Sequence, residues 1–347
     1  MTASSTNAGG IPAESIVSVP GNLLLMGEYA VLEEGGLGVT IAVDRRITAL
    51  LSTSPRLTLS GSWGSQRVVW PGEVGDTLLD CIVRSAAHVL QVQPELLCDL
   101  PLSVVVDSTP FYGKGGDKSG FGSSAAVAAA LSHAILLGVD AYFAPAKGFP
   151  SPGGSLLDRT FTAALNGHRA FQGGRGSGYD VAASVYGGIG QFTGGVRPAF
   201  RRVHIEWLPE MAVVAGRSPV KTPGAVGRYL EWRRSHALEA DEFLQESNRC
   251  VKGFLDSKSW GDARAWFEAS RELGLSIGEE TGVPAEIELP AELVGFPAKA
   301  LGAGNEIAIV FAPDSDFGNL PDGLLHPFKV SEQGVASGVG RGDSNGR

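Results

Sequence analysis

The sequence predicts an α+β protein in which helices cover one side of a largely antiparallel sheet. Segments with the apolar pattern of strands alternate with long helical segments, but few of them form the strand-helix-strand units that a parallel sheet requires. The chain has 347 residues, of which 43% are hydrophobic. It can therefore bury a large core, and because it exceeds the usual size of one domain we expect two lobes.

The first half predicts five strands and three helices in a definite order. A glycine- and proline-rich loop, 141–154, separates the second helix from the third, and the run AAVAAALSHAILL, 125–137, is able to form only a helix. The expected strands lie near 16–26, 37–52, 57–60, 67–70 and 103–108, and the expected helices near 76–91, 125–137 and 155–172.

The second half predicts strands in FRRVHIEWL and MAVVAG, followed by helices from about 224 to 278. Within that helical part, one face carries Phe243, Ser247, Cys250, Val251 and Phe254. The sequence contains no repeats. We expect a flexible N-terminus over 1–15, a first lobe over 16–198, a second lobe over 199–337 and a disordered, glycine-rich tail over 338–347.

The stretch KSGFGSSAA, Lys118 to Ala126, is a glycine and serine loop that leads directly into a helix. Glycines allow a tight turn whose N–H groups converge, and the helix N-terminus adds its positive dipole end, so the loop fits a phosphate. The alternative is a flexible loop in which Ser123 and Ser124 cap the helix. The Walker pattern is absent, because Lys118 precedes the glycines.

Asp180 lies among small residues in GRGSGYDVAASVYGG, 174–188, at the start of a short expected helix and before the apolar strand GIGQF. This placement suits a general base that faces a cleft. It suits equally well an aspartate that caps the helix VAASVY, and the segment alone does not decide between the two.

Three segments resemble the signatures of the GHMP kinases, the family named for galactokinase, homoserine kinase, mevalonate kinase and phosphomevalonate kinase. The first is VPGNLLLMGEYAVLEEG, 19–35; the second is the loop described above, with Phe121 in place of leucine; the third is KALGAGNEIAIVFA from Lys299, one residue shorter than in relatives. The tract RAFQGGRGSGYDVAASVYG is most similar to the phosphomevalonate kinases. The resemblance covers most of residues 16–335.

The resemblance implies a ribosomal-S5-like N-terminal lobe and a ferredoxin-like α+β C-terminal lobe. It also implies an enzyme that uses ATP and Mg²⁺ to convert phosphomevalonate to diphosphomevalonate, in isoprenoid precursor synthesis by the mevalonate pathway. Phosphoryl transfer depends on positioning and charge neutralisation, so a phosphate loop, Mg²⁺, a cation and a base are sufficient.

The same resemblance assigns roles to individual residues. Asp180 is expected to be the catalytic base, and Lys118 to balance the charge that is transferred. The ATP phosphates are expected to contact Gly120, Gly122, Ser123, Ser124 and Ala125, with Ser124 also binding Mg²⁺. The acceptor is expected to contact Asn22, Glu28, Tyr29, Arg175, Ser177, Gly178, Gly302 and Ala303.

Two residues depart from the family pattern. Asn22 stands where most relatives have lysine, and Arg169, eleven positions before Asp180, stands where mevalonate kinases have a Mg²⁺-binding glutamate. No Mg²⁺ carboxylate is therefore assigned, and Asn22→Lys is expected to be neutral or mildly activating in a working kinase. Mevalonate kinase, another GHMP small-molecule kinase, and a non-catalytic GHMP-like sensor of nucleotide or metabolite remain alternatives.

The formal charge of −9 argues against nucleic acid or an anionic membrane as a partner. We expect the partners to be ATP and a small phosphorylated hydroxy acid, and the protein to be a monomer or homodimer. The N-terminus lacks the features of a signal peptide, and no stretch of about 18 apolar residues is expected to cross a bilayer. A cytoplasmic protein is expected.

The cysteines and histidines predict no metal site. Cys81, Cys98 and Cys250 are odd in number and contain no CxxC pair, which indicates a reducing compartment. His133 and His168 lie in expected helices without a metal-binding motif, so we expect each to have a core or helix-surface role.

Overall fold

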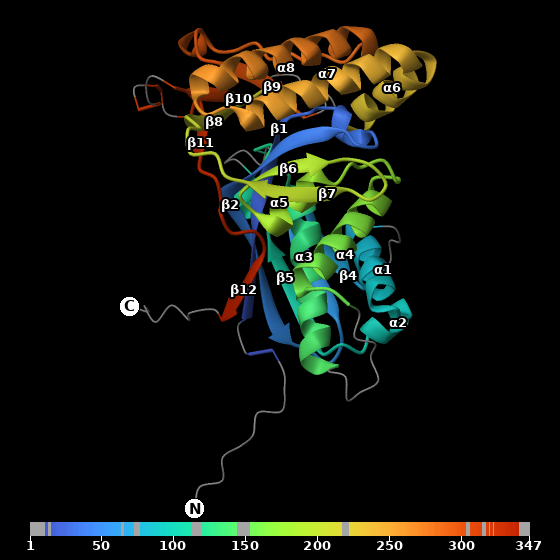
Figure 1. Cartoon of the computed structure of the whole chain (residues 1–347). Coiled ribbons are helices and arrows are strands. Elements are labelled where there is room, and N and C mark those ends of the chain that lie inside the picture. Colours follow the sequence, from blue (N-terminus) through green and yellow to red (C-terminus); the bar gives the residue numbers. More distant parts are fainter. Residues whose placement is uncertain are drawn as a thin grey trace, which may run out of the picture.

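The computed structural model describes residues 11–12, 15–63, 66–72, 77–112, 119–143, 153–216, 222–302, 306–313, 317–318, 320–321 and 323–339. These residues form two sheets, and the helices lie against the sheets in separate layers (Figure 1). The mixture of helices and mainly antiparallel strands confirms the predicted α+β class.

The first sheet has the strand order β12-β1-β2-β5-β3-β4, and β6 and β7 extend it beside β2. All of its described pairs are antiparallel except β3 with β5. β2 is long enough to pair with β5 along Thr48–Thr53 and with β6 along Leu37–Ile41. The strands are β1 Ser15–Met26, β2 Leu37–Thr53, β3 Thr58–Trp63, β4 Gln66–Trp70, β5 Leu102–Asp107, β6 Ile189–Thr193, β7 Ala199–Val203 and β12 Ala336–Val339.

Helices cover one face of this sheet, as the sequence predicted. The helix α1 begins with a capping box between Thr77 and Asp80, and α4 begins at a cap made by Ser155. The central helix α3 packs against β1, α1, α4 and α5 (Figure 1). The helices are α1 Leu78–Leu90, α2 Pro94–Leu97, α3 Ser123–Tyr142, α4 Leu156–Phe171 and α5 Tyr179–Tyr186, with short 3₁₀ turns η1 Ala30–Leu32 and η2 Thr109–Phe111.

The helix α3 differs from the expectation that no segment is long and apolar enough to cross a bilayer. By length and composition it is the one helix among the described residues that could cross a bilayer, although no such segment was expected. Most of that helix is buried within the protein, because its alanines and leucines face the sheet on one side and the neighbouring helices on the others. Its apolar composition is thus that of a core helix.

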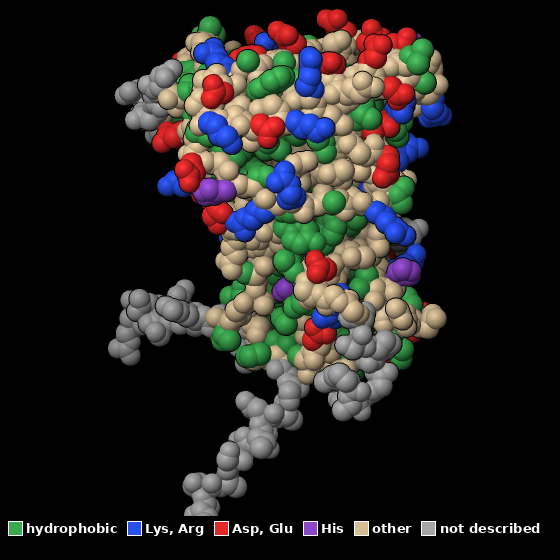
Figure 2. Space-filling view, in the orientation of Figure 1, with side chains coloured by type: hydrophobic (Ala, Val, Ile, Leu, Met, Phe, Trp, Pro, Cys, Tyr) green, Lys and Arg blue, Asp and Glu red, His purple; other side chains and the backbone are tan. Residues whose placement is uncertain are grey.

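The second sheet has the order β11-β8-β10-β9 and is antiparallel. Three long helices accompany it at the top of Figure 1, and acidic and basic side chains are interspersed over them on the face shown in Figure 2. The predicted apolar face of α7 is confirmed, since Ser247, Cys250, Val251 and Phe254 are buried and Phe243 is half-buried. The elements are β8 Glu210–Ala215, α6 Thr222–Ser235, α7 Ala237–Asp256, α8 Trp260–Thr281, η4 Ala291–Leu293, β9 Ala298–Leu301, β10 Ile307–Ala312 and β11 His326–Phe328.

The chain crosses between the sheets at places that differ from the expected boundaries. β7, at the start of the expected second lobe, pairs with β6 in the first sheet, so the chain leaves that sheet between Val203 and Glu210. It returns in β12, whose Ala336–Val339 pair with Ser15–Ser18 of β1. Residues 338 and 339 of the expected tail therefore belong to a strand, whereas 340–347 lie outside the described residues.

Candidate active site

The described part of the predicted phosphate loop, 119–122, lies between η2 and α3. Gly120 and Gly122 have positive φ values of 78° and 68°, a conformation that favours glycine. Gly122 is the N-cap residue of α3, and no side chain among the described residues caps that helix. The capping role considered for Ser123 and Ser124 is therefore wrong, and the first turn of α3 presents the N–H groups and dipole end that suit an anion.

Both glycines are also required by close packing. A Cβ at Gly120 would lie 2.5 Å from Cγ2 of Ile307 on β10, so the loop packs tightly against the second sheet. A Cβ at Gly122 would lie 2.1 Å from Oδ1 of Asn22 on β1. The loop is thus held between the two lobes.

Asn22 lies behind the phosphate loop. Its side chain is buried, and Nδ2 donates hydrogen bonds to the carbonyl oxygen of Gly122 at 3.2 Å and to Oγ of Ser184 at 2.9 Å. Its backbone N–H donates to the carbonyl oxygen of Phe121 at 3.0 Å. Asn22 therefore joins β1, the loop and α5, and it does not line the cavity that contains Asp180.

Asp180 lies in the first turn of α5, whose N-cap residue is Gly178 with a φ of 93°. The alternative in which Asp180 caps this helix is therefore wrong. Its Oδ1 accepts a hydrogen bond of 2.8 Å from the N–H of Val181, and its side chain is 19% exposed. Asp180 is one of the residues that line a cavity of about 100 Å³.

This cavity brings together residues from three of the sequence motifs. Tyr29 comes from the first signature, Arg175, Ser177 and Asp180 come from the segment 174–188, and Gly302 comes from the third signature. Apolar residues of β1 and η1 complete the wall. A cation, a hydroxyl and a carboxylate beside an apolar wall suit a small, anionic organic molecule.

His168, which the sequence placed in a core or surface role, contacts two predicted site residues. Its Nε2 lies 3.0 Å from Oγ of Ser124, and its Nδ1 lies 3.6 Å from Oδ2 of Asp180. The imidazole is 2% exposed. Because Ser124 lies in the first turn of α3 and Asp180 lies in the first turn of α5, His168 lies between the phosphate loop and the candidate base.

Arg169, the next residue of α4, holds the loop that precedes Asp180. Its guanidinium donates to the carbonyl oxygens of Gly176 at 2.8 Å and Ser177 at 2.7 Å, and also to those of Gly195 at 3.0 Å and Val196 at 3.2 Å. Burial lowers the pKa of Arg169, and the nearby Asp180 opposes that shift. Four carbonyl partners explain why arginine, with its fork of N–H donors, stands at this position.

The Gly27–Tyr29 turn of the first signature connects the two lobes. Glu28 forms a buried ion pair with Lys299 of β9, and Nζ of Lys299 also donates to the carbonyl oxygen of Leu25 at 3.2 Å. Burial raises the pKa of Glu28, and Lys299 opposes this rise. Tyr29 stacks on Tyr229 of α6 with ring centroids 5.0 Å apart, and burial raises its pKa to about 12. This turn therefore forms the junction of β1, β9 and α6 beside the cavity.

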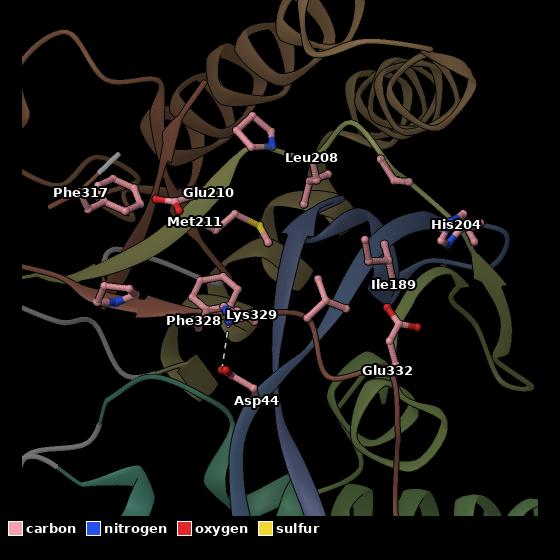
Figure 3. Close-up of a pocket in the computed structure, with 15 residues that line it drawn as sticks. Asp44, Ile189, His204, Leu208, Glu210, Met211, Phe317, Phe328, Lys329 and Glu332 are labelled. Atoms are coloured by element: carbon pink, nitrogen blue, oxygen red, sulfur yellow. Dashed lines mark hydrogen bonds between the residues drawn. The ribbon is translucent and has the colours of Figure 1, made fainter. Parts of the chain in front are cut away.

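A larger cavity, of about 450 Å³, lies elsewhere and contains none of the predicted site residues. It lies among β8, β11 and the strands β6 and β7, and Figure 3 shows Met211, Leu208 and Ile189 around it, with the N–H of Lys329 donating to Asp44. The candidate site is therefore the smaller cavity at Asp180, where the motifs converge.

Two predicted residues, Lys118 and Ala303, lie outside the described residues. Reasoning from the sequence alone missed His168, Gln172, Tyr179 and Lys299, of which Gln172 and Tyr179 line the cavity. Burial raises the pKa of Tyr179, with Asp180 adding to the shift, so its phenol stays a hydrogen-bond donor. The one available signal for His168 and Gln172 was their spacing of four residues, which places them on one face of α4 just before the glycine-rich segment.

The described residues contain no group of three or more His, Cys, Asp or Glu side chains that could hold a metal ion. Mg²⁺ commonly binds through one or two protein oxygens together with the phosphates of its substrate. The hydroxyl of Ser124, at the N-terminus of α3, fits that limited role. Arg169 supplies no ligand for a cation, because its guanidinium has only donors.

Comparison with protein-family models found no match. Among curated proteins, the chain is similar to the phosphomevalonate kinase of Streptomyces sp. (strain CL190), with 27% identity and coverage of 82% of this chain and 86% of that protein.

Solved structures with the same fold include a Lin0012 protein from Listeria innocua, with a TM-score of 0.75, 24% identity, and coverage of 94% of this chain and 100% of that one. Another is Streptococcus pneumoniae phosphomevalonate kinase in complex with phosphomevalonate and AMPPNP, with a TM-score of 0.63, 16% identity, and coverage of 86% and 92%. These similarities confirm the resemblance indicated by the motifs, and the chain has the two-lobed fold of the GHMP kinases.

Proposed function

We propose that this protein is an ATP-dependent small-molecule kinase that converts phosphomevalonate and ATP to diphosphomevalonate and ADP. The observation that carries the proposal is the position of Asp180: it lines the cavity, and one buried imidazole lies between its carboxylate and Ser124 in the first turn of α3. A candidate base is thus adjacent to a phosphate-binding helix terminus, as in-line phosphoryl transfer requires. The similarity to phosphomevalonate kinases supports this choice of acceptor.

In this proposal the first turn of α3 binds the ATP phosphates through its backbone N–H groups. Mg²⁺ would neutralise charge on those phosphates, with the Ser124 hydroxyl as its candidate protein ligand. Asp180 orients the acceptor oxygen and takes its proton. Arg175, an exposed cation on the cavity wall, pairs with an anionic group of the acceptor, and Lys118 balances the transferred charge.

The test is a panel of ATP-consumption assays with mevalonate, phosphomevalonate, diphosphomevalonate, galactose and homoserine. The proposal expects turnover with phosphomevalonate above that with the other four. Faster turnover of another acceptor would show a kinase of different specificity. Binding of AMPPNP without turnover of any acceptor would show a sensor, the outcome suggested by Asn22 at the position of the usual lysine.

A further inference from the structure

We propose that His168 is a positioning residue that couples Ser124 at the phosphate loop to the candidate base Asp180. This inference rests on the proposed function, because it assigns a role within the same site. It concerns a residue from α4, an element that supplies neither the phosphate loop nor the base.

The geometry places His168 between the first turns of two helices. Nε2 is within hydrogen-bond distance of Ser124 Oγ, at 3.0 Å, whereas Nδ1 is 3.6 Å from Asp180 Oδ2, which makes that contact electrostatic. The imidazole is 2% exposed, so water does not compete for either nitrogen. Each side of the ring therefore faces a different part of the phosphoryl-transfer site.

The neighbours of His168 favour one arrangement of its proton. The amide Nε2 of Gln172 lies 3.5 Å from the ring Nε2 and is only a donor, and the Asp180 carboxylate attracts a proton on Nδ1. With the proton on Nδ1, the ring Nε2 accepts a hydrogen bond from the hydroxyl of Ser124. The oxygen of Ser124 then keeps its remaining lone pairs available for a cation.

The same arrangement fixes the direction of Asp180. Its Oδ1 is held by the N–H of Val181, and Oδ2 faces His168, so the whole carboxylate is restrained from two sides. A general base gains efficiency when its orientation is fixed before the acceptor binds. His168 thus restrains both the hydroxyl of Ser124, which would be the Mg²⁺ ligand, and the base through one rigid ring.

His133 provides a matched contrast within the same helix pair. It is also buried between α3 and α4, and its Nδ1 lies 3.0 Å from Oγ1 of Thr160. It lines neither of the cavities described above. A variant at His133 therefore reports the effect of removing a buried imidazole from this interface without changing the site.

The experiment compares His168→Asn, His168→Gln and His133→Asn with the parent protein. An asparagine amide reaches the place of Nδ1 and can face Asp180 but not Ser124, whereas a glutamine amide reaches the place of Nε2 and can bond Ser124 but not Asp180. The measurements are kcat and KM with phosphomevalonate, titration with Mg²⁺ and AMPPNP, and thermal unfolding.

We expect the two His168 variants to affect different properties of the protein. His168→Asn should weaken Mg²⁺-AMPPNP binding by roughly 10-fold or more, and His168→Gln should keep that affinity but lower kcat by a similar factor. This is the range seen when a group that holds a metal ligand in place is removed. His133→Asn should change stability alone. A merely structural role would instead lower both properties of the two His168 variants together, in step with their melting temperatures.

Besides that joint loss, two results would overturn the proposal. If the parent is active and both His168 variants match His133→Asn in kcat and in AMPPNP affinity, His168 has no positioning role and the proposed function still stands. If the parent turns over no acceptor, the proposed function fails, and only the AMPPNP titration still tests the role of His168. An AMPPNP affinity of His168→Asn equal to that of the parent would then refute the link between His168 and Ser124.

Discussion

The side-chain amide of Asn22 donates a 2.9 Å hydrogen bond to the hydroxyl of Ser184, and this bond ties β1 to α5 beneath the phosphate loop. The same amide also holds the carbonyl oxygen of Gly122. Asn22 is therefore part of the support of the loop, a role that its place in the first signature did not reveal.

This arrangement changes the expectation for Asn22→Lys. A lysine here would bury an unpaired ammonium and leave Ser184 without its donor, so we expect a loss of at least about 2 kcal/mol in unfolding free energy and reduced nucleotide affinity. Ser184→Ala is the control, with an expected loss of about 1 kcal/mol. Urea denaturation measures both. A lysine variant with the parent's stability and a raised kcat would contradict this expectation. It would support instead the view that Asn22 stands in place of a catalytic lysine.

Arg169→Lys should weaken binding of the acceptor more than binding of the nucleotide. A lysine cannot reach the carbonyl oxygens of both Gly176 and Gly195 as the guanidinium does, so the loop before Asp180 should loosen. We expect KM for the acceptor to rise by roughly 10-fold, with KM for ATP nearly unchanged. Steady-state kinetics check this. The control is Arg159→Lys on the same helix, where the arginine pairs with Asp140 away from the cavity; equal effects of the two variants would contradict the assignment.

Glu28→Gln should strongly destabilise the protein. It would leave the ammonium of Lys299 buried without its carboxylate, and removal of one partner from a buried pair typically costs about 3–5 kcal/mol. The double variant Glu28→Met with Lys299→Met should recover part of that loss, because neither charge remains buried. Glu268→Gln, in the exposed pair with Arg264, should cost at most about 1 kcal/mol. Chemical denaturation tests all three, and a Glu28→Gln loss no larger than that of Glu268→Gln would refute the role of the pair.

His133 should make stability depend on pH. Burial lowers its pKa to about 4 from the ordinary 6.5, with Asp140 opposing the shift. Since the unfolded chain binds the proton more readily, stability is fully present above pH 6.5 and is lost as the pH falls toward 4. The loss attributable to His133 should be about 2 kcal/mol at pH 5 relative to pH 7. Denaturation of the parent and of His133→Asn at the two pH values isolates this contribution; identical pH dependence in the two proteins would contradict it.

The sequence predicted the local elements well because each carries its own signal. The apolar run of β1, the small residues of α3 and the glycines at 120 and 122 determine structure over short distances. The pairing of β12 with β1 could not be predicted in this way. It joins residues more than 300 positions apart, and nothing within Ala336–Val339 specifies that partner.

The residues of the candidate site could likewise be predicted only where they lie close together in the sequence. Asp180 and the phosphate loop were found from motifs, because their glycines and small residues are contiguous in the chain. The role of His168 depends on how α3, α4 and α5 approach one another, and the pairing of Lys299 with Glu28 depends on contact between the two lobes. Such relationships arise from tertiary packing, which a single sequence does not display.

Asp180→Asn gives the most direct test of the account, since the amide keeps the shape of the carboxylate but cannot accept the proton of the acceptor. We expect kcat with phosphomevalonate to fall by roughly 10²-fold or more, while AMPPNP affinity and melting temperature stay close to those of the parent. An Asn variant that turns over phosphomevalonate at nearly the parent's rate would contradict the assignment of Asp180 as the base.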